Sequence, residues 1–275
     1  MKKTATIVLN RNLPRETDDL VEQLLDLDRE YTDIFVVEAG SDRNRLSKYC
    51  TWHVNTPEVV KEGLRYSRGM NYGLLELWRN SQWQKYDSFF LITNDTKLSE
   101  GKPSIRILQE ILEKNPKIGI LSPCSEKWGE KKLIGEKSLK YFWFIHNNAY
   151  FLRKEMLDQL IFKDNPNYLN FLFDGDNFRG YLSEVEIISR AYANDWAAAI
   201  TTEVFAEEEE SYLLNQNDLI KTESYDKNMQ LYIDEGLKWV KRKYGFNNRW
   251  QMMQFSKLFY DKFFEYFPEE RSKKI

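Results

Sequence analysis

Short apolar runs alternate with longer amphipathic stretches over the first 205 residues of the chain. The apolar runs end at polar clusters and predict buried strands at 6–9, 33–37, 89–92 and 117–121. The amphipathic stretches predict helices at 17–29 with Thr17 as N-cap, from Pro57, at 70–80, and from Pro103. This alternation predicts an α/β fold, a mainly parallel twisted sheet with helices on both faces.

The pattern changes after about residue 140. A long aromatic strand is expected over 141–152, and further segments are expected as helices at 153–160 and 183–195 and a strand at 197–205. The run of four glutamates at 207–210 is typical of a solvated turn and marks a boundary. We therefore expect one α/β domain over 1–210 and a C-terminal helical extension over 211–275.

The residue pattern of the extension predicts two helices over 226–267, split at Gly245. The second helix has large apolar residues at helical spacing, among them Trp250, Leu258 and Phe263. Such a stripe most often lies in the core or at a dimer interface. Docking onto a membrane surface is the more specific alternative. The charges of this helix are mixed in sign, which weakens the membrane interpretation.

Composition excludes several classes of protein. The 275 residues are 42% hydrophobic and 30% charged, with a net charge of −3, whereas a dedicated nucleic-acid binder would show a basic excess. Cys50 and Cys124 are expected as reduced thiols, and two histidines are too few for a His-rich zinc site. The chain shows neither a signal-peptide pattern nor an apolar run approaching the roughly 20 residues of a membrane helix. A cytoplasmic location is expected.

Polar side chains follow three of the predicted strands. They are Asn10-Arg11-Asn12, then Glu38 to Asp42, and then Thr93-Asn94-Asp95-Thr96. Ligands of an open α/β sheet bind outside the carboxyl ends of its strands, so these side chains are expected at one edge. A carboxylate such as Asp95 suits a hard divalent cation that holds a diphosphate, although Asn-Asp after a strand is also a common turn. No P-loop or Gly-x-Gly-x-x-Gly pattern is present.

Five motifs in order resemble the inverting GT-A glycosyltransferases of family 2, over roughly residues 4–207. The first strand and its loop match, the second strand ends in Glu38-Ala39-Gly40-Ser41, and Gly69-Met70-Asn71-Tyr72-Gly73-Leu74 follows. Next come the metal motif Thr93-Asn94-Asp95-Thr96 and the segment from Phe173 to Ile187 with Arg190 after it.

The resemblance implies a role for each matched residue. The nucleotide would lie among Leu9, Asn10, Arg11, Glu38, Asn71, Asn94 and Asp95, with Glu38 by the base. Asp95 would coordinate Mg²⁺ or Mn²⁺, and Glu184 would be the general base that takes the proton of the acceptor hydroxyl.

The chain departs from the family pattern at several of these positions. Thr93 replaces the first acid of the metal motif, Ser183 stands where a Glu is usual, and Glu184 replaces an Asp. Many relatives have a histidine after the last strand, where the spacing places Glu207. Glu207 is either a replacement metal ligand or a residue of the solvated turn.

Several residues also have ordinary structural interpretations. Asp174 and Asp176 are expected to cap the turn around Gly175, and Glu186 to pair with Arg190 at i, i+4. Glu38 would then be a turn acid and Glu184 a helix-end acid. His146, in an aromatic segment, is expected as a buried hydrogen-bonded side chain.

The resemblance implies transfer of a sugar from a UDP- or dTDP-linked donor to a hydroxyl of a glycan or lipid-linked glycan, with inversion. The product would be a cell-surface polysaccharide, made in the cytoplasm or at the inner face of the membrane. The C-terminal helices would contact the acceptor, a second copy of the chain or the membrane surface. Two alternatives stay open: a non-catalytic binding or assembly subunit of the same fold, and a sugar-1-phosphate nucleotidyltransferase. The second would need a Gly-rich loop after the first strand, and residues 10–19 contain no glycine.

Overall fold

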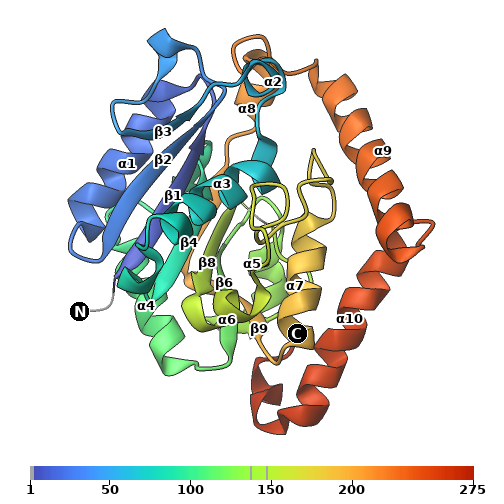
Figure 1. Ribbon diagram of the computed structural model, residues 1–275. Helices are drawn as coiled ribbons and strands as arrows, with labels where there is room; N and C mark the ends of the chain where they lie inside the picture. Colours follow the sequence, from blue (N-terminus) through green and yellow to red (C-terminus); the bar gives the residue numbers. More distant parts are fainter. Residues whose placement is uncertain (1–2, 137, 147) are drawn as a thin grey trace.

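A central sheet with helices on both faces forms the body of the protein, as the computed structural model shows (Figure 1). The structure describes residues 3–136, 138–146 and 148–275. These residues form a nine-stranded sheet. Eight strands follow the order β3-β2-β1-β4-β8-β6-β9-β5, and the ninth, β7, pairs with β9. The strands are β1 (Thr4–Asn10), β2 (Thr32–Ala39), β3 (Cys50–Val54), β4 (Ser88–Thr93), β5 (Thr96–Leu98), β6 (Ile118–Cys124), β7 (Leu139–Tyr141), β8 (Ala149–Arg153) and β9 (Ala197–Glu208).

Strand direction divides the sheet. β1 pairs in parallel with β2 and β4, β2 with β3, and β6 with β9. β8 lies antiparallel between β4 and β6, and the short strands β5 and β7 are antiparallel to β9. The predicted α/β sheet with flanking helices is confirmed, and its strands are more mixed in direction than expected.

Most predicted helices are present in the structure. The helices are α1 (Pro14–Asp28), α2 (Pro57–Glu62), α3 (Arg65–Arg79), α4 (Ser104–Lys114), α5 (Glu130–Ile134), α6 (Lys154–Leu160), α7 (Ser183–Ala193), α8 (Ser211–Asn215), α9 (Tyr225–Tyr244) and α10 (Arg249–Tyr266). However, α3 begins five residues before the predicted residue 70, and α5 and α8 were not predicted. Short 3₁₀ turns add η1 (Arg43–Arg45), η2 (Trp83–Lys85) and η3 (Pro268–Lys273). α1 begins at Pro14 rather than after Thr17, because proline suits the first helical turn.

Two glycines of α3 let that helix approach β1 closely. A Cβ atom at Gly69 would lie 2.4 Å from Leu9 Cδ1, and one at Gly73 would lie 2.7 Å from Ile7 Cγ2. Any larger side chain at either position would push the helix away from the sheet. The segment that matches the family motif is therefore a packing seam between α3 and β1.

The aromatic segment 141–152 is not one strand, so that prediction is wrong. It contains the end of β7 and most of β8, and the chain between them forms no strand in the described residues. Tyr150 Oη donates to the carbonyl of Ile145 at 2.6 Å, which holds this connection against β8. The ring of His146 stacks on Trp128, and burial lowers the pKa of His146 to about 4. His146 is therefore neutral, consistent with a structural role.

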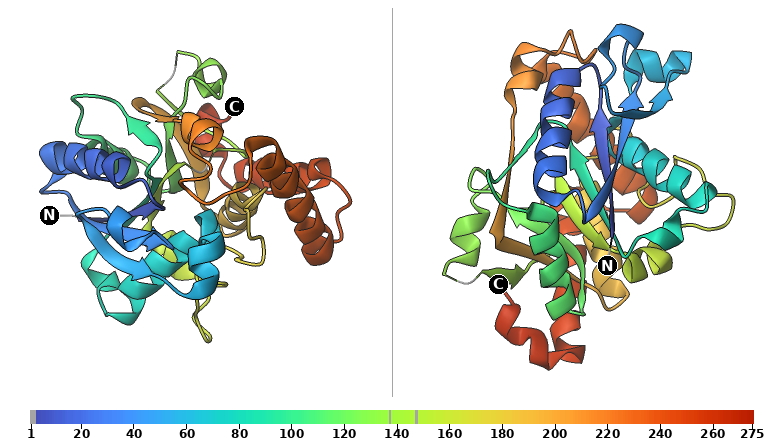
Figure 2. Two further views of the ribbon diagram at one scale, coloured as in Figure 1. Left: turned by 90° about the horizontal axis from the view of Figure 1, so that it is seen from above. Right: turned by 90° about the vertical axis from the view of Figure 1, so that its left-hand side faces the viewer.

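The last two helices run along one side of the molecule (Figures 1 and 2). Tyr260, Phe263 and Phe264 of α10 are buried in the main core, where the helix packs on α7. Trp250 and Leu258 of the same helix are 63% and 54% exposed. The predicted stripe is therefore partly core and partly surface, and the domain boundary at residue 210 stays a prediction. Among the described residues, none of the helices has the length and apolar character needed to cross a bilayer.

Candidate functional site

The carboxyl ends of β1, β2 and β4 meet, and their polar side chains bond to one another. Asn10 Nδ2 donates to Glu38 Oε2 at 2.8 Å, and Asn94 Nδ2 donates to Asn10 Oδ1 at 2.8 Å. Asn10 and Glu38 are almost fully buried. The three strand ends are thus held in register by side-chain hydrogen bonds.

Glu38 is saturated with protein donors. Besides Asn10, its carboxylate accepts from Ser41 Oγ at 2.6 Å and from the backbone N–H of Ser47 at 2.8 Å. These bonds hold the loop after β2 in place. The role of Glu38 beside a nucleobase stays a prediction, since its carboxylate oxygens are occupied in this conformation.

Asn71 is also occupied by the protein. Its Oδ1 accepts from the N–H groups of Leu172 and Phe173, both at 2.9 Å, and its Nδ2 donates to the carbonyls of Tyr168 and Phe173 at 3.0 and 2.8 Å. Asn71 is fully buried. It fastens the 168–173 segment to α3, and its predicted place around the nucleotide remains untested.

A cavity of about 200 Å³ opens at these strand ends. Five of the predicted nucleotide residues line it, and Glu38 and Asn71 do not: the five are Leu9, Asn10, Arg11, Asn94 and Asp95. Its outer wall comes from far along the chain, with Tyr212, Leu213, Ile220 and Thr222. We call residues 211–223 the cover. The cavity is smaller than the roughly 300–1,000 Å³ of most small-molecule sites, and a neighbouring cavity of about 350 Å³ shares Asn94, Asp95 and Tyr212 with it.

Arg11 forms part of the cavity wall. Its Nη2 donates to the carbonyls of Val60 and Lys61 at 3.0 and 3.1 Å, and its Nε is buried without a partner. Burial, together with the charge of Arg65, lowers the pKa of Arg11 to about 10. Arg11 is still charged at neutral pH and has a donor to spare for an anionic ligand.

Asp95, which lines the cavity, lies next to a second acidic residue, Glu208, where β5 runs beside β9. The carbonyl of Asp95 accepts from Glu209 N at 2.9 Å, and Thr96 pairs with Glu208 where β5 runs beside β9. Asp95 Oδ1 is buried without a hydrogen-bond partner. Burial raises the pKa of Asp95, and burial followed by the charge of Asp95 raises the pKa of Glu208 to about 7. Negative charge at Asp95 thus disfavours ionisation of Glu208, and the charge of Glu209 adds to the cost of ionising Asp95, so a bound cation or proton would relieve this site.

Glu207 does not share this site. Its carboxylate accepts from Ser125 Oγ at 2.8 Å and from the N–H groups of Glu126 and Lys127 at 2.6 and 3.4 Å. The expectation of a solvated turn is wrong, because Glu207 lies in β9, and its alternative role as a metal ligand stays a prediction. β9 extends to Glu208, so the strand continues two residues into the segment 207–210 that was predicted as a turn.

Glu184 lies in the first turn of α7 and has a buried carboxylate oxygen without a partner. It is 7% exposed, and its Oε2 is buried without a hydrogen bond. The hydroxyls of Tyr66 and Ser183 are also buried without partners. Burial raises the pKa of Glu184 to about 7.

The hydroxyl of Tyr232 in α9 is influenced by the charges of both Glu184 and Glu208. Burial raises its pKa, and the charges of both Glu184 and Glu208 raise it further. Glu184 and Glu208 therefore lie within electrostatic reach of one side chain. α9 was predicted as part of the extension, and sequence patterning assigned Tyr232 no role.

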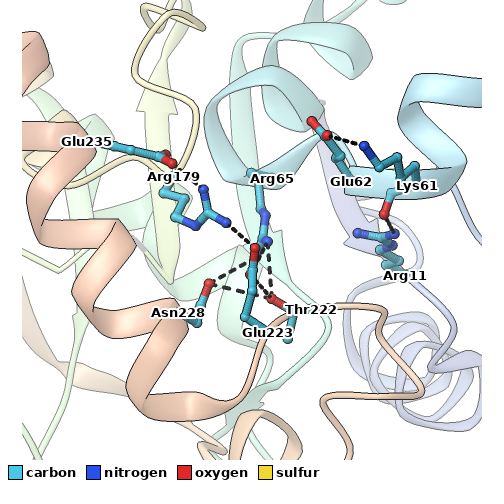
Figure 3. Close-up of polar contacts among 9 residues, drawn as sticks. All are labelled: Arg11, Lys61, Glu62, Arg65, Arg179, Thr222, Glu223, Asn228 and Glu235. Atoms are coloured by element: carbon cyan, nitrogen blue, oxygen red, sulfur yellow. Dashed lines mark hydrogen bonds and ion pairs between the residues drawn. The ribbon is translucent and has the colours of Figure 1, made fainter.

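An ion-pair network holds the end of the cover (Figure 3). Glu223 lies between Arg179, at 2.6 Å, and Arg65, at 3.4 Å, and Arg179 also pairs with Glu235 of α9 at 2.5 Å. Burial opposes ionisation of Glu223, yet hydrogen bonds from its own backbone and from Arg179 hold its pKa at about 2. Arg65 lines the cavity as well, so the network and the cavity share a wall.

Two further contacts hold the middle of the cover. Asn12 Nδ2 donates to the carbonyl of Leu219 at 2.8 Å, and Lys221 Nζ pairs with Asp42 Oδ1 at 2.6 Å. Asn12 and Asp42 follow β1 and β2. The closed cover is thus attached to the same strand ends that line the cavity.

Solved structures share this architecture at low sequence identity. GalNAc-T7 with UDP, GalNAc and Mn²⁺ superposes over 98% of this chain with a TM-score of 0.57 and 8% identity. TarS of S. aureus in complex with UDP matches 87% of this chain and 72% of its own, with a TM-score of 0.53 and 11% identity. The mannosyltransferase PcManGT of Pyrobaculum calidifontis, with GDP-Man and Mn²⁺, covers 94% and 73% at a TM-score of 0.50 and 9% identity. The chain has the GT-A fold.

The likeness is one of fold. No protein-family model and no curated protein matches the sequence. This chain spans 57% of the GalNAc-T7 chain, so it covers little more than half of that protein. What the GT-A domain does must therefore be argued from its own residues.

The expected ion pair between Glu186 and Arg190 does not form in the described part of this GT-A domain. Glu186 instead accepts from Tyr244 Oη at 2.5 Å and pairs with Lys243 at 2.6 Å, so it ties α7 to the end of α9. Arg190 Nη1 donates to the carbonyl of Leu172 at 2.5 Å. The predicted turn cap is confirmed for Asp174, whose Oδ1 accepts from the N–H of Asp176 at 3.0 Å, whereas the Asp176 carboxylate lies near Arg242.

Proposed function

We propose that this chain is a glycosyltransferase that moves a sugar from a UDP- or dTDP-linked donor to a hydroxyl of a glycan, with inversion. The observation that carries the proposal is the pair of Asp95, which lines the strand-end cavity, and the half-buried Glu208 next to it, whose pKa is raised by burial and by the charge of Asp95. Support also comes from the fold, since structures of the same fold contain UDP or GDP-Man, two of them with Mn²⁺.

The two carboxylates fit a divalent cation. Among the described residues neither forms an ion pair with a lysine or arginine, and Asp95 Oδ1 has no hydrogen-bond partner. Carboxylate oxygens are the ligands that Mg²⁺ and Mn²⁺ prefer, and Glu208 supplies the second acid that Thr93 lacks. No group of three or more His, Cys, Asp or Glu occurs in the described residues, so Asp95 and Glu208 would share the ion with the donor. When bound, the metal would stabilise the charge on the departing diphosphate.

Glu184 is proposed as the general base. As the acceptor oxygen forms its bond to the anomeric carbon, Glu184 takes the hydroxyl proton. The bond between that carbon and the donor phosphate oxygen breaks, and its electron pair leaves with the nucleoside diphosphate. A single displacement from the opposite face inverts the anomeric configuration. A pKa near 7 suits this role, because the group can both hold and release a proton near neutral pH.

The acceptor is proposed to be a growing cell-surface glycan or its lipid-linked form, at the cytoplasmic side of the membrane. This part rests on resemblance of motifs. A second candidate is a non-catalytic binding or assembly subunit. The small cavity and Thr93 in place of the first metal acid favour it.

Calorimetric titration separates the two candidates. UDP, dTDP and GDP are titrated with and without Mn²⁺ into the wild-type protein, into Asp95→Ala and into the control Asp176→Ala, which removes a carboxylate more than half exposed. The transferase proposal expects metal-dependent binding of one nucleotide that is lost in Asp95→Ala and retained in the control. Absence of binding to all three nucleotides would reject it and favour the non-catalytic subunit.

A further inference from the structure

The turn between α9 and α10 carries a concentration of positive charge. From Gly236 to Tyr260 the sequence has six basic residues and no acidic one, although the chain as a whole has a net charge of −3. Figure 1 places this turn on the outer side of the molecule, away from β1 to β4, and the left view of Figure 2 agrees. The charge is therefore presented at one projecting edge.

Only part of this charge is neutralised by the protein. Lys243 pairs with Asp174 at 2.7 Å and with Glu186 at 2.6 Å. Arg242 lies 3.4 Å from Asp176, but both side chains are more than half exposed, so that pair is weak. In the described part of the chain no ion pair involves Lys238, Lys241 or Arg249, and all three are exposed.

Large apolar side chains stand beside these cations. Trp250 is 63% exposed and Leu258, two turns further along α10, is 54% exposed. The guanidinium of Arg249 lies 4.7 Å from the Trp250 ring centre. The nearest acid on this helix, Asp261, pairs with Lys257 and with Lys274, so its charge is compensated. We call Lys238, Lys241, Arg242, Arg249, Trp250 and Leu258 the cationic tip.

We propose that the cationic tip docks on an anionic lipid surface. Exposed cations next to an exposed tryptophan and leucine are the chemistry of interfacial membrane binding, in which the cations attract anionic headgroups and the apolar groups enter the boundary region. A second copy of this chain fits less well, because two identical tips would bring like charges together.

The docked surface is attached to the candidate base. Trp239 and Val240 of α9 pack with Leu182 and Val185 beside Glu184, and Met252 of α10 joins the same cluster. Docking would therefore hold the Glu184 side of the protein near the lipid. The tip is separate from the strand-end cavity, so this proposal stands whether or not the chain transfers a sugar.

Vesicle co-sedimentation tests the proposal with the full chain. Wild-type protein is mixed with vesicles of phosphatidylcholine alone, or of phosphatidylcholine with one quarter phosphatidylglycerol. Binding is expected with the anionic vesicles only, and high salt should weaken it. The triple variant Lys238→Glu/Lys241→Glu/Arg249→Glu should bind at least about tenfold more weakly, since each basic residue near an anionic surface contributes measurably. Trp250→Ala should also bind more weakly.

A matched control separates local from net charge. Lys114→Glu/Lys131→Glu/Lys132→Glu makes the same change in net charge at exposed lysines of α4 and α5, and it should bind like the wild type. Circular dichroism melting checks that each variant folds, and Trp250→Ala provides the test if the charge-reversal variant does not. Equal binding to both vesicle types, no binding, self-association without vesicle binding, or equal loss in both triple variants would overturn the proposal.

Discussion

Glu208 lies beside Asp95 where β9 passes β5, and the charge of Asp95 raises the cost of ionising Glu208. Burial is the larger cause in both residues, and the charge of Asp95 adds to it at Glu208. A site of this kind is unfavourable when empty and favourable when a cation is bound.

Glu208→Gln should therefore shift metal affinity and metal-free stability in opposite directions. Mn²⁺ binding, followed by electron paramagnetic resonance, should weaken by at least about tenfold because a ligand is lost. The metal-free variant should melt at a higher temperature at pH 8, because a buried charge is removed. Glu203→Gln, which changes an exposed carboxylate on the same strand β9, is the control and should leave Mn²⁺ affinity unchanged. Unchanged Mn²⁺ affinity in Glu208→Gln would exclude Glu208 as a ligand.

Glu184→Gln should abolish sugar transfer while leaving nucleotide affinity intact. The amide keeps the size of the side chain but cannot accept the proton of an acceptor hydroxyl. Loss of a general base commonly slows a reaction by about 10²–10⁴-fold. Transfer is measured as release of nucleoside diphosphate, and binding by calorimetry. Full activity in Glu184→Gln would show that another group takes the proton.

The same substitution should stabilise the protein in a pH-dependent way. The pKa of Glu184 is raised from 4.5 to about 7 in the folded state, so the folded protein binds this proton more tightly than the unfolded chain. The stability associated with Glu184 is complete below about pH 4.5 and decreases as the pH rises to about 7. Glu184→Gln should match the wild type near pH 4.5 and exceed it by up to about 3 kcal/mol at pH 8. Urea unfolding at the two pH values measures the difference, and equal stability at both would show that the pKa is not raised.

Asn71→Ala should cost stability rather than nucleotide affinity. The substitution leaves the buried backbone groups of Tyr168, Leu172 and Phe173 without partners. We expect a loss of about 2–4 kcal/mol in the free energy of unfolding, measured with urea. Asn80→Ala, at an exposed helix end, is the control and should change stability little. An intact free energy of unfolding with weakened nucleotide binding would instead support the role that the resemblance assigns to Asn71.

Glu223→Gln should loosen the cover. The amide keeps the shape of Glu223 but loses its charge, so the ion pairs with Arg65 and Arg179 are lost. Limited proteolysis should then cut faster within residues 211–222. Glu269→Gln, which changes an exposed residue of the last 3₁₀ turn, should not alter the rate. Equal rates in all three proteins would show that the ion pairs do not hold the cover.

The edge of the sheet that carries the site could be predicted from sequence, because parallel strands bring their carboxyl ends together. Asn10, Glu38 and Asn94 follow three separate apolar runs, and the structure bonds them to one another. Burial of Glu38 could not be predicted, since it depends on Ser41 and Ser47 reaching its carboxylate.

Sequence spacing could not decide whether Glu207 or Glu208 is the better candidate for a metal ligand. Neighbouring side chains on a strand point in opposite directions, so an error of one residue exchanges the face. The pairing of β6 with β9 shifts register between Pro123 and Cys124, which disturbs a count made from the start of β9. Strands β3 and β5 were missed because β5 has only three residues and the side chains of β3 are exposed or only partly buried.

Gly69, Asn71 and Gly73 have packing roles that do not depend on the proposed reaction. The two glycines allow α3 to lie against β1, and the asparagine fastens a distant loop to that helix. A chain with this packing that does not transfer a sugar would need the same three residues. Their presence in a chain therefore indicates the close packing of α3 on β1, whereas the proposed reaction depends on Asp95, Glu184 and Glu208 at other positions.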